Sequence, residues 1–193
     1  TSAASPGTLL VGDVGWSNWE ETDVVAQPGQ NFGWPCMEGF HANLPYQTAG
    51  PAHNGCGSVG SPTNPNAWTP PISDWNHTDA TLSSPPGVTG LAAAGGAFYS
   101  DTLYPGSYRG RYFFADYAEG WIRVATVGSN LTLMSTLDFG STMESPVDLR
   151  VNPANGDLYY VSIATGEVRR IRYTGPVESN SAPLAQAAAT PRF

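Results

Sequence analysis

The chain contains no lysine, and its eight basic residues are all arginines. The first of them is Arg109, so residues 1–108 carry eight acidic residues and no basic one, while residues 109–193 carry eight of each. The formal net charge of −8 therefore belongs to the first part of the chain. So acidic a protein is not expected to bind nucleic acid or anionic membranes, because both partners need clustered cations.

Long apolar runs are also lacking, and none approaches the ~20 residues that a membrane-spanning helix needs. The sequence shows no signal peptide, so a secreted form is expected to be processed already. Charged residues make up only 12%, about half the usual share, whereas 22 glycines and 17 prolines are many. With 40% hydrophobic residues in 193, the chain is long enough for one domain with a core. This composition favours a loop-rich β protein.

Cysteine is scarce as well, with Cys36 and Cys56 as the two examples. They lie in a segment rich in glycine, proline and asparagine, where one disulfide that closes a long loop would contribute roughly 3 kcal/mol. Two free buried thiols are the alternative. A zinc site is not expected, because two cysteines and scattered histidines do not provide the usual ligand spacing.

Short segments rich in aromatic and β-branched residues, separated by turns, predict β-strands. The predicted strands span residues 8–14, 20–25, 96–101, 111–116, 120–127, 131–139, 146–152, 157–163 and 166–173. The last seven form two antiparallel meanders that end near residues 140 and 174, with hairpin turns at Asn155-Gly156 and Thr165-Gly166. Two consecutive propeller blades of roughly 40 residues fit this pattern, and a β-sandwich is the alternative.

Residues 40–95 show almost no periodicity. Loops of this length in a compact domain are usually lids or binding loops, so a functional loop is predicted here. Trp68 and Trp75 are expected to pin it to the body of the domain. His77 lies in this segment, two residues before Asp79, and is either a general base or oriented ligand or a surface loop histidine.

The stretch from Gly12 to Gly39 concentrates unusual residues. It holds three of the six tryptophans, and four acids fall within eleven residues: Asp13, Glu20, Glu21 and Asp23. No cation lies near them in the sequence. Such a run is either a solvated acidic face or a site for a hard cation, and Ca²⁺ is the usual one where oxygen ligands gather on a loop. The residues alone leave both interpretations open.

A second group of polar and aromatic residues follows the predicted strand at 111–116. Acids beside aromatic rings on a blade-top loop suit a sugar site, in which rings stack on the sugar and carboxylates accept from its hydroxyls. A blade-packing motif is the alternative, since aromatics at blade edges are ordinary in propellers. The residues in question are Asp116, Tyr117, Glu119 and Trp121.

Several motifs resemble the glucose/sorbosone dehydrogenase family: GDVGW followed by WEE, then NFGWPCMEG, and above all GAFYSDTLYPGSYRGRYFFADYAEGWIR at 96–123. The resemblance runs from Gly12 to Gly175 and implies an all-β fold, a six-bladed β-propeller of which about three blades are present. Residues 1–174 are expected to be the C-terminal half of that domain. Residues 175–193, rich in Pro, Ala and Ser, are expected to be a linker toward an immunoglobulin-like module.

The resemblance also implies a function, because many family members oxidise sugars with pyrroloquinoline quinone and Ca²⁺. The backbone carbonyls of Gly15 and Trp16 match those that hold the ion under the quinone, and Glu21 matches an acid that serves a second calcium site in some members. The catalytic histidine of the family comes from the N-terminal half, so it is expected to lie outside this chain.

The quinone contacts of the family are poorly matched. Members that bind the cofactor commonly carry Arg-x-Arg-Asp where this chain reads Ser-Pro-Val-Asp at 145–148, and Lys or Arg where it has Ala118. The cofactor carries several carboxylates, for which cationic side chains are the natural clamp. Arg123 and Arg150 are the arginines that would have to substitute.

Two functions from different classes follow. In the first, the chain is part of a secreted sugar dehydrogenase that uses the quinone and calcium in the complete domain. In the second, it is a non-catalytic carbohydrate-binding or structural propeller module of an extracellular multidomain protein or assembly. In both, the expected partners are carbohydrate and either the missing half of the propeller or another chain.

Overall fold

The structure is a computed structural model that describes residues 8–49, 56, 68–175 and 188–191. These residues fold into β-strands and one short α-helix, which confirms the predicted all-β fold. None of the helices in the described part of the chain is long and apolar enough to cross a membrane. The chain divides into two compact units. We call residues Gly7–Ala93 the acidic unit and residues Ala94–Phe193 the arginine-containing unit.

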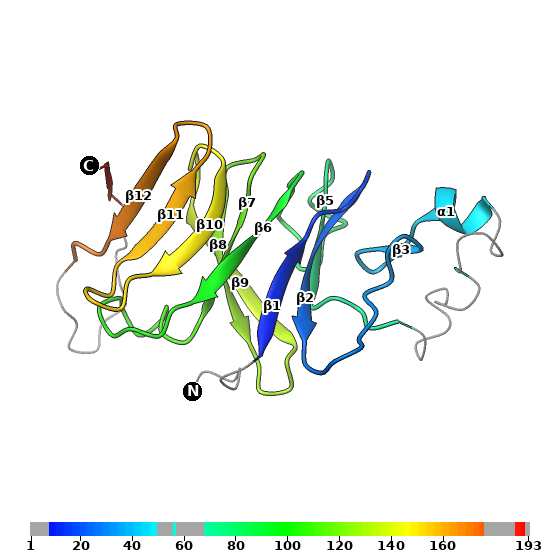
Figure 1. Ribbon diagram of the computed structural model, residues 1–193, viewed down its shortest axis with the longest axis horizontal. Coiled ribbons are helices and arrows are strands. Elements are labelled where there is room, and N and C mark those ends of the chain that lie inside the picture. Colours follow the sequence, from blue (N-terminus) through cyan, green and yellow to red (C-terminus); the bar gives the residue numbers. More distant parts are fainter. Residues whose placement is uncertain (1–7, 50–55, 57–67, 176–187, 192–193) are drawn as a thin grey trace. The chain divides into compact units, whose positions relative to one another are not determined.

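The acidic unit is built on a three-stranded antiparallel sheet in the order β1-β2-β5 (Figure 1). Beside the sheet lie a two-stranded hairpin and one turn of helix. The elements are β1 (Leu9–Asp13), β2 (Trp19–Val25), β3 (Met37–Glu38), β4 (His41–Ala42), α1 (Leu44–Thr48) and β5 (Ser73–Asn76). The strands predicted at 8–14 and 20–25 are therefore confirmed.

The segment predicted as one long loop, residues 40–95, contains regular structure. β5 pairs with β2, and α1 follows the hairpin. Trp75 on β5 is 1% exposed, and the Nε1–H of Trp68 donates to the carbonyl of Phe32 at 2.9 Å, so both tryptophans pin the segment as predicted. A disulfide joins Cys36 to Cys56 and confirms the predicted bridge.

The arginine-containing unit consists of two four-stranded sheets, in the orders β6-β7-β8-β9 and β10-β11-β12-β13 (Figure 1). The strands of the first are β6 (Ala93–Phe98), β7 (Tyr112–Asp116), β8 (Trp121–Val127) and β9 (Leu133–Gly140). Those of the second are β10 (Pro146–Val151), β11 (Leu158–Ser162), β12 (Glu167–Arg172) and β13 (Ala188–Pro191). Strands β7 to β9 and β10 to β13 pair antiparallel, as the predicted meanders require.

Two differences from the predicted strands have physical reasons. β6 begins at Ala93, three residues before the predicted start, and its Gly96 lies so close to β7 that a Cβ would be 1.7 Å from the carbonyl oxygen of Phe113. The fourth strand, β13, comes from the range predicted as a linker and pairs with β12. Residues 176–187 and 192–193 of that range lie outside the described residues.

A shared aromatic core joins the two sheets of the arginine-containing unit. Phe113, Ile122, Leu149 and Leu158 are fully buried in it. The Tyr99 hydroxyl donates to the Gly156 carbonyl at 2.7 Å, and the Tyr104 hydroxyl donates to the Ile171 carbonyl at 2.6 Å. Because buried hydroxyls need such partners, the two tyrosines fix where one sheet packs on the other.

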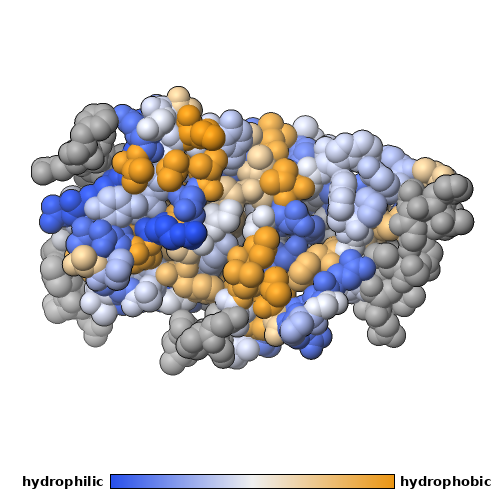
Figure 2. Space-filling view, viewed as in Figure 1, coloured by the Kyte–Doolittle hydropathy of each residue, from blue (hydrophilic) through white to orange (hydrophobic). Residues whose placement is uncertain are grey.

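Apolar surface is also exposed. Figure 2 shows several separate hydrophobic groups, set among hydrophilic ones, on the face that it displays. Exposed apolar side chains occur in both units and include Leu9 and Leu44 of the acidic unit and Met134 and Val168 of the arginine-containing unit. Scattered apolar side chains of this kind are normal on a protein surface.

Candidate metal centre

The acidic unit buries five carboxylates. Their residues are between 0% and 6% exposed: Glu20, Glu21, Asp23, Glu38 and Asp74. Residues 1–108 contain neither lysine nor arginine that could neutralise them. Burying a carboxylate is costly unless it is paired or hydrogen-bonded, so each of the five needs a partner or a proton.

Glu20 has a histidine partner. Its Oε1 lies 2.9 Å from Nε2 of His77, whose side chain is 14% exposed, and its Oε2 accepts the backbone N–H of Ala93 at 2.6 Å. The sequence suggested a role for His77 beside Asp79, but Asp79 accepts from Thr81 instead. The contact of His77 is therefore with a carboxylate 57 residues away, on β2.

Glu38 is held by the loop that follows β1. Its Oε1 accepts the backbone N–H groups of Ser17, Asn18 and Trp19 at 2.6, 2.9 and 3.2 Å. Burial alone raises the pKa of Glu38, but the backbone N–H donors outweigh burial and the pKa is lowered. Only glycine fits at position 15, since a Cβ there would lie 1.5 Å from the carbonyl oxygen of Trp19. The loop is thus wrapped around an ionised carboxylate.

Asp74 has three partners. Its carboxylate accepts the N–H groups of Phe40 at 3.0 Å and Ser84 at 3.2 Å, and His41 Nε2 lies 3.2 Å away. Burial raises the pKa of Asp74, and the two N–H groups and His41 oppose that rise. The His41 ring also stacks on Trp19, with a centroid distance of 3.7 Å.

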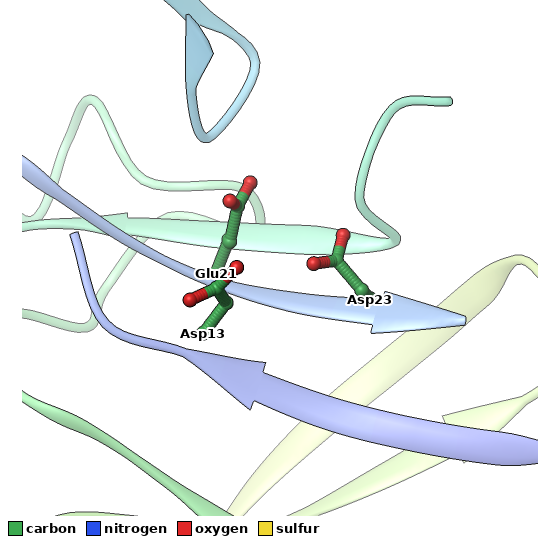
Figure 3. Close-up of side chains that lie close together, drawn as sticks. All are labelled: Asp13, Glu21 and Asp23. Atoms are coloured by element: carbon green, nitrogen blue, oxygen red, sulfur yellow. The ribbon is translucent and has the colours of Figure 1, made fainter. Parts of the chain in front are cut away.

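The remaining two buried acids, Glu21 and Asp23, gather with Asp13. Asp13 of β1 lies directly opposite Glu21 of β2 in the antiparallel register. Glu21 and Asp23 are two residues apart on β2, so their side chains project from the same face of the sheet. One oxygen from each of the three carboxylates lies within 4.8 Å of the others (Figure 3). We call these three residues the acid cluster.

Two oxygens of the acid cluster are buried and lack a hydrogen-bond donor among the described residues: Glu21 Oε2 and Asp23 Oδ1. Burial, then the charges of Asp23, Asp13 and Asp74, raise the pKa of Glu21 to about 9. Burial, then the charge of Asp13, raises the pKa of Asp23 to about 7. A backbone hydrogen bond from Gly39 lowers the pKa of Glu21, but it does not offset burial and the neighbouring acids.

This geometry suits a hard cation. Oxygens that bind one Ca²⁺ at 2.3–2.6 Å lie no more than about 5 Å from one another, and the acid cluster meets that limit. Carboxylates alone, without sulfur or imidazole, match calcium better than zinc. A calcium ion in the cluster would neutralise the buried charges and occupy the two orphaned oxygens.

The predicted calcium residues fall in two places. Glu21 lies in the acid cluster, whereas Gly15 and Trp16 belong to the loop around Glu38. Asp13 and Asp23 were part of the acidic run but had no assigned role. Asp13 lies near Glu21 because of the β1–β2 register, which the sequence does not reveal. The spacing of Glu21 and Asp23, two residues apart on one strand, could have indicated that they share a face. Glu20 belongs to the same run but pairs with His77.

The predicted sugar residues after β7 form a turn. Asp116 is buried, and its Oδ1 accepts the N–H groups of Ala118 and Glu119 at 3.0 and 2.9 Å. Tyr117 is 40% exposed, and Trp121 packs edge-on against Phe114. Asp116 thus shapes the β7–β8 connection, while Tyr117 and Glu119 face solvent.

The two arginines expected to substitute in the cofactor clamp are paired with acids. Arg123 lies 2.5 Å from Asp138, and Arg150 lies 3.2 Å from Asp148. Elsewhere in the described sheets, Arg169 pairs with Glu144 and Glu167, and Arg170 with Asp157. These residues do not fit a quinone with several carboxylates.

No family model matches this chain. It is 28% identical over 166 residues to HIPL1 protein of Arabidopsis thaliana, covering 81% of this chain and 21% of that protein. HIPL2 protein of the same plant is 30% identical over 152 residues, which cover 77% of this chain and 20% of that protein. The chain thus spans about a fifth of the length of these relatives.

Among solved structures, a crystal structure of glucose dehydrogenase matches with a TM-score of 0.57 and 17% sequence identity. The match covers 85% of this chain and 41% of that one. At such identity the likeness concerns the fold. The three larger sheets of this chain are therefore blades of a β-propeller of the sugar dehydrogenase type.

Proposed function

We propose that this chain is a calcium-binding part of a secreted propeller protein that acts on sugars. The acid cluster carries the proposal, because two of its buried oxygens lack donors among the described residues and residues 1–108 contain no lysine or arginine. The family resemblance and the glucose dehydrogenase neighbour support sugars as substrates. The disulfide fits an oxidising compartment and so supports secretion.

In this proposal the carboxylates of Asp13, Glu21 and Asp23 hold one calcium ion. The carbonyls of Gly15 and Trp16 belong to a separate calcium site, the one that the family resemblance implies under the quinone. The ion at the acid cluster supplies the positive charge that the sheet lacks. It joins β1 to β2 through their side chains and so stabilises the acidic unit.

Isothermal titration calorimetry of the chelator-treated chain with Ca²⁺ tests this proposal. We expect saturable binding that Asp23→Asn or Glu21→Gln weakens at least tenfold, since each removes a charged ligand. Asp79→Asn is the matched control, because Asp79 makes the same charge change on a surface turn of the same unit. Equal weakening by all three variants, or no binding by the unaltered chain, would refute the site.

In the complete domain, the proposed activity is oxidation of a sugar with pyrroloquinoline quinone, with the catalytic histidine outside this chain. The paired arginines favour a second candidate function, a non-catalytic carbohydrate-binding module. An absorbance titration with the quinone and Ca²⁺, on the longest available form of the protein, separates the two. Saturable binding that a chelator abolishes supports the quinone-dependent dehydrogenase, and no binding well above micromolar concentrations supports the non-catalytic module.

The remainder of the propeller, or another chain, is the proposed protein partner. The support is that the matched glucose dehydrogenase chain is covered to only 41%. Sedimentation velocity of the 193-residue chain tests the idea, and a compact monomer at all concentrations would contradict it.

A further inference from the structure

We propose that Trp16, Trp34 and Tyr46 form a stacking site for a neutral oligosaccharide, which we call the aromatic platform. It belongs to the acidic unit and shares no side chain with the acid cluster. The inference does not rest on calcium at the acid cluster, and it uses the ring of Trp16 rather than the carbonyl assigned to the other calcium site.

The ring of Tyr46 contacts both tryptophan rings, and the two tryptophans face solvent. Trp16 is 56% exposed and Trp34 is 50% exposed. The ring centroid of Tyr46 lies 5.2 Å from that of Trp16 and 5.6 Å from that of Trp34. Aromatic side chains have large apolar faces, which most proteins bury. Two indoles that stay half exposed beside one tyrosine therefore leave apolar ring surface available to a ligand.

Each ring is carried by a backbone segment that hydrogen bonds hold in place. The loop with Trp16 is held by the bonds from Ser17 and Asn18 to Glu38. The corner with Trp34 is closed by the N–H groups of Cys36 and Met37, which both donate to the Gly33 carbonyl.

Tyr46 sits on α1, which is tied to the same corner. The backbone N–H of Asn43 and the side-chain amide of Gln47 both donate to the carbonyl of Cys36, at 2.9 and 2.8 Å. Rings held in place before binding lose little conformational entropy when a ligand stacks on them. The anchored backbone of the aromatic platform therefore favours ligand binding.

The chemistry of the surroundings selects the ligand class. Residues 1–108 carry no basic side chain, so phosphates, nucleic acids and acidic sugars find no counter-charge. The neighbouring Ser17 and Asn18 are exposed and offer a hydroxyl and an amide beside Trp16. Apolar ring faces with neutral polar groups at their rim match a pyranose, which has apolar C–H faces and equatorial hydroxyls. Two exposed indoles favour an oligosaccharide over a single sugar.

Affinity gel electrophoresis with soluble β-glucan, xylan and amylose, each tested with Ca²⁺ present, tests the platform. We expect at least one of these polysaccharides to retard the chain. Trp16→Ala and Trp34→Ala should each weaken that binding about tenfold, and Trp16→Phe should restore part of it because a ring is kept. Tryptophan fluorescence of the unaltered chain should shift on addition of the same polysaccharide.

Leu82→Ala is the matched control, since Leu82 is 55% exposed in the same unit and has no ring. Thermal melting shows whether each variant folds, and calcium titration of Trp34→Ala should match that of the unaltered chain. Absence of retardation by every polysaccharide, or retardation unchanged in the double tryptophan variant, overturns the proposal. A loss of self-association in that variant, without sugar binding by the unaltered chain, shows instead an interface between copies and also overturns it.

Discussion

At the scale of single residues, the acidic unit uses histidines and backbone N–H groups where other proteins use lysine and arginine. Glu20 depends on His77 and the Ala93 N–H, and Asp74 on His41 and two N–H groups. Glu38 depends on three backbone N–H groups and the hydroxyl of Ser17. A buried carboxylate that loses a partner keeps its desolvation cost. Removing one of these contacts should therefore destabilise the fold by more than an ordinary hydrogen bond would.

His77→Ala should therefore lower the free energy of unfolding by about 3 kcal/mol, the cost of leaving a buried charge partly unpaired. His41→Ala is the control, because the side chain of His41 is 44% exposed and Asp74 keeps its two N–H donors. We expect it to cost about 1 kcal/mol. Urea denaturation of both variants measures the difference, and equal losses would show that burial of the pair is unimportant.

A second prediction at this scale concerns pH. Burial first, and then neighbouring acids, raise the pKa of Glu21 to about 9 and that of Asp23 to about 7, from 4.5 and 3.8. The folded chain then binds protons more tightly than the unfolded chain. The contribution of these two carboxyls to the stability of the calcium-free protein should be greatest below pH ~4 and be lost as pH rises through 7 and toward 9.

Saturating Ca²⁺ should abolish or reverse this slope, because the ion binds the deprotonated carboxylates. Chemical denaturation at pH 5 to pH 8, with chelator or with Ca²⁺, gives both slopes. A calcium-free protein as stable at the upper end of that range as at the lower end would mean that the acid cluster is not destabilising.

At the scale of elements, strands with aromatic and β-branched residues were predictable, because their side chains themselves favour a pleated and half-buried backbone. β7, β8 and β11 lie within two residues of their predicted limits. β5, with the sequence Ser-Asp-Trp-Asn, was not predictable, since its conformation comes from pairing with β2 rather than from its own preferences. The same holds for the acid cluster, which needs the β1–β2 register that sequence alone does not provide.

The disulfide is the covalent support for the least regular elements. Cys36 and Cys56 are 20 residues apart. Cys36 directly precedes β3, and its own carbonyl accepts the hydrogen bond from Gln47 of α1. In the chain-entropy model, closing a loop of this length contributes about 3 kcal/mol. Cys36→Ser with Cys56→Ser should lower the stability of the acidic unit by that amount, as measured by chemical denaturation. A reducing agent should have the same effect on the unaltered chain and no effect on the double variant.

At the scale of the whole molecule, charge is divided between the two units. All arginines lie in the arginine-containing unit, and the acid cluster lies wholly in the acidic unit. A ligand that binds only the folded form of one unit stabilises that unit by RT ln(1 + [L]/Kd), which is about 2.7 kcal/mol at 100 times Kd. Calcium should therefore distinguish the two units in a thermal unfolding experiment.

Differential scanning calorimetry of the chelator-treated chain should show two transitions, one for each compact unit. Added Ca²⁺ should raise the midpoint of one by several degrees and leave the other in place. Asp23→Asn should abolish that shift, whereas Asp138→Asn, on β9 in the other unit, should preserve it. A single transition that moves as a whole with Ca²⁺ would show that the units unfold together, and the ion would then support the entire chain rather than its acidic part.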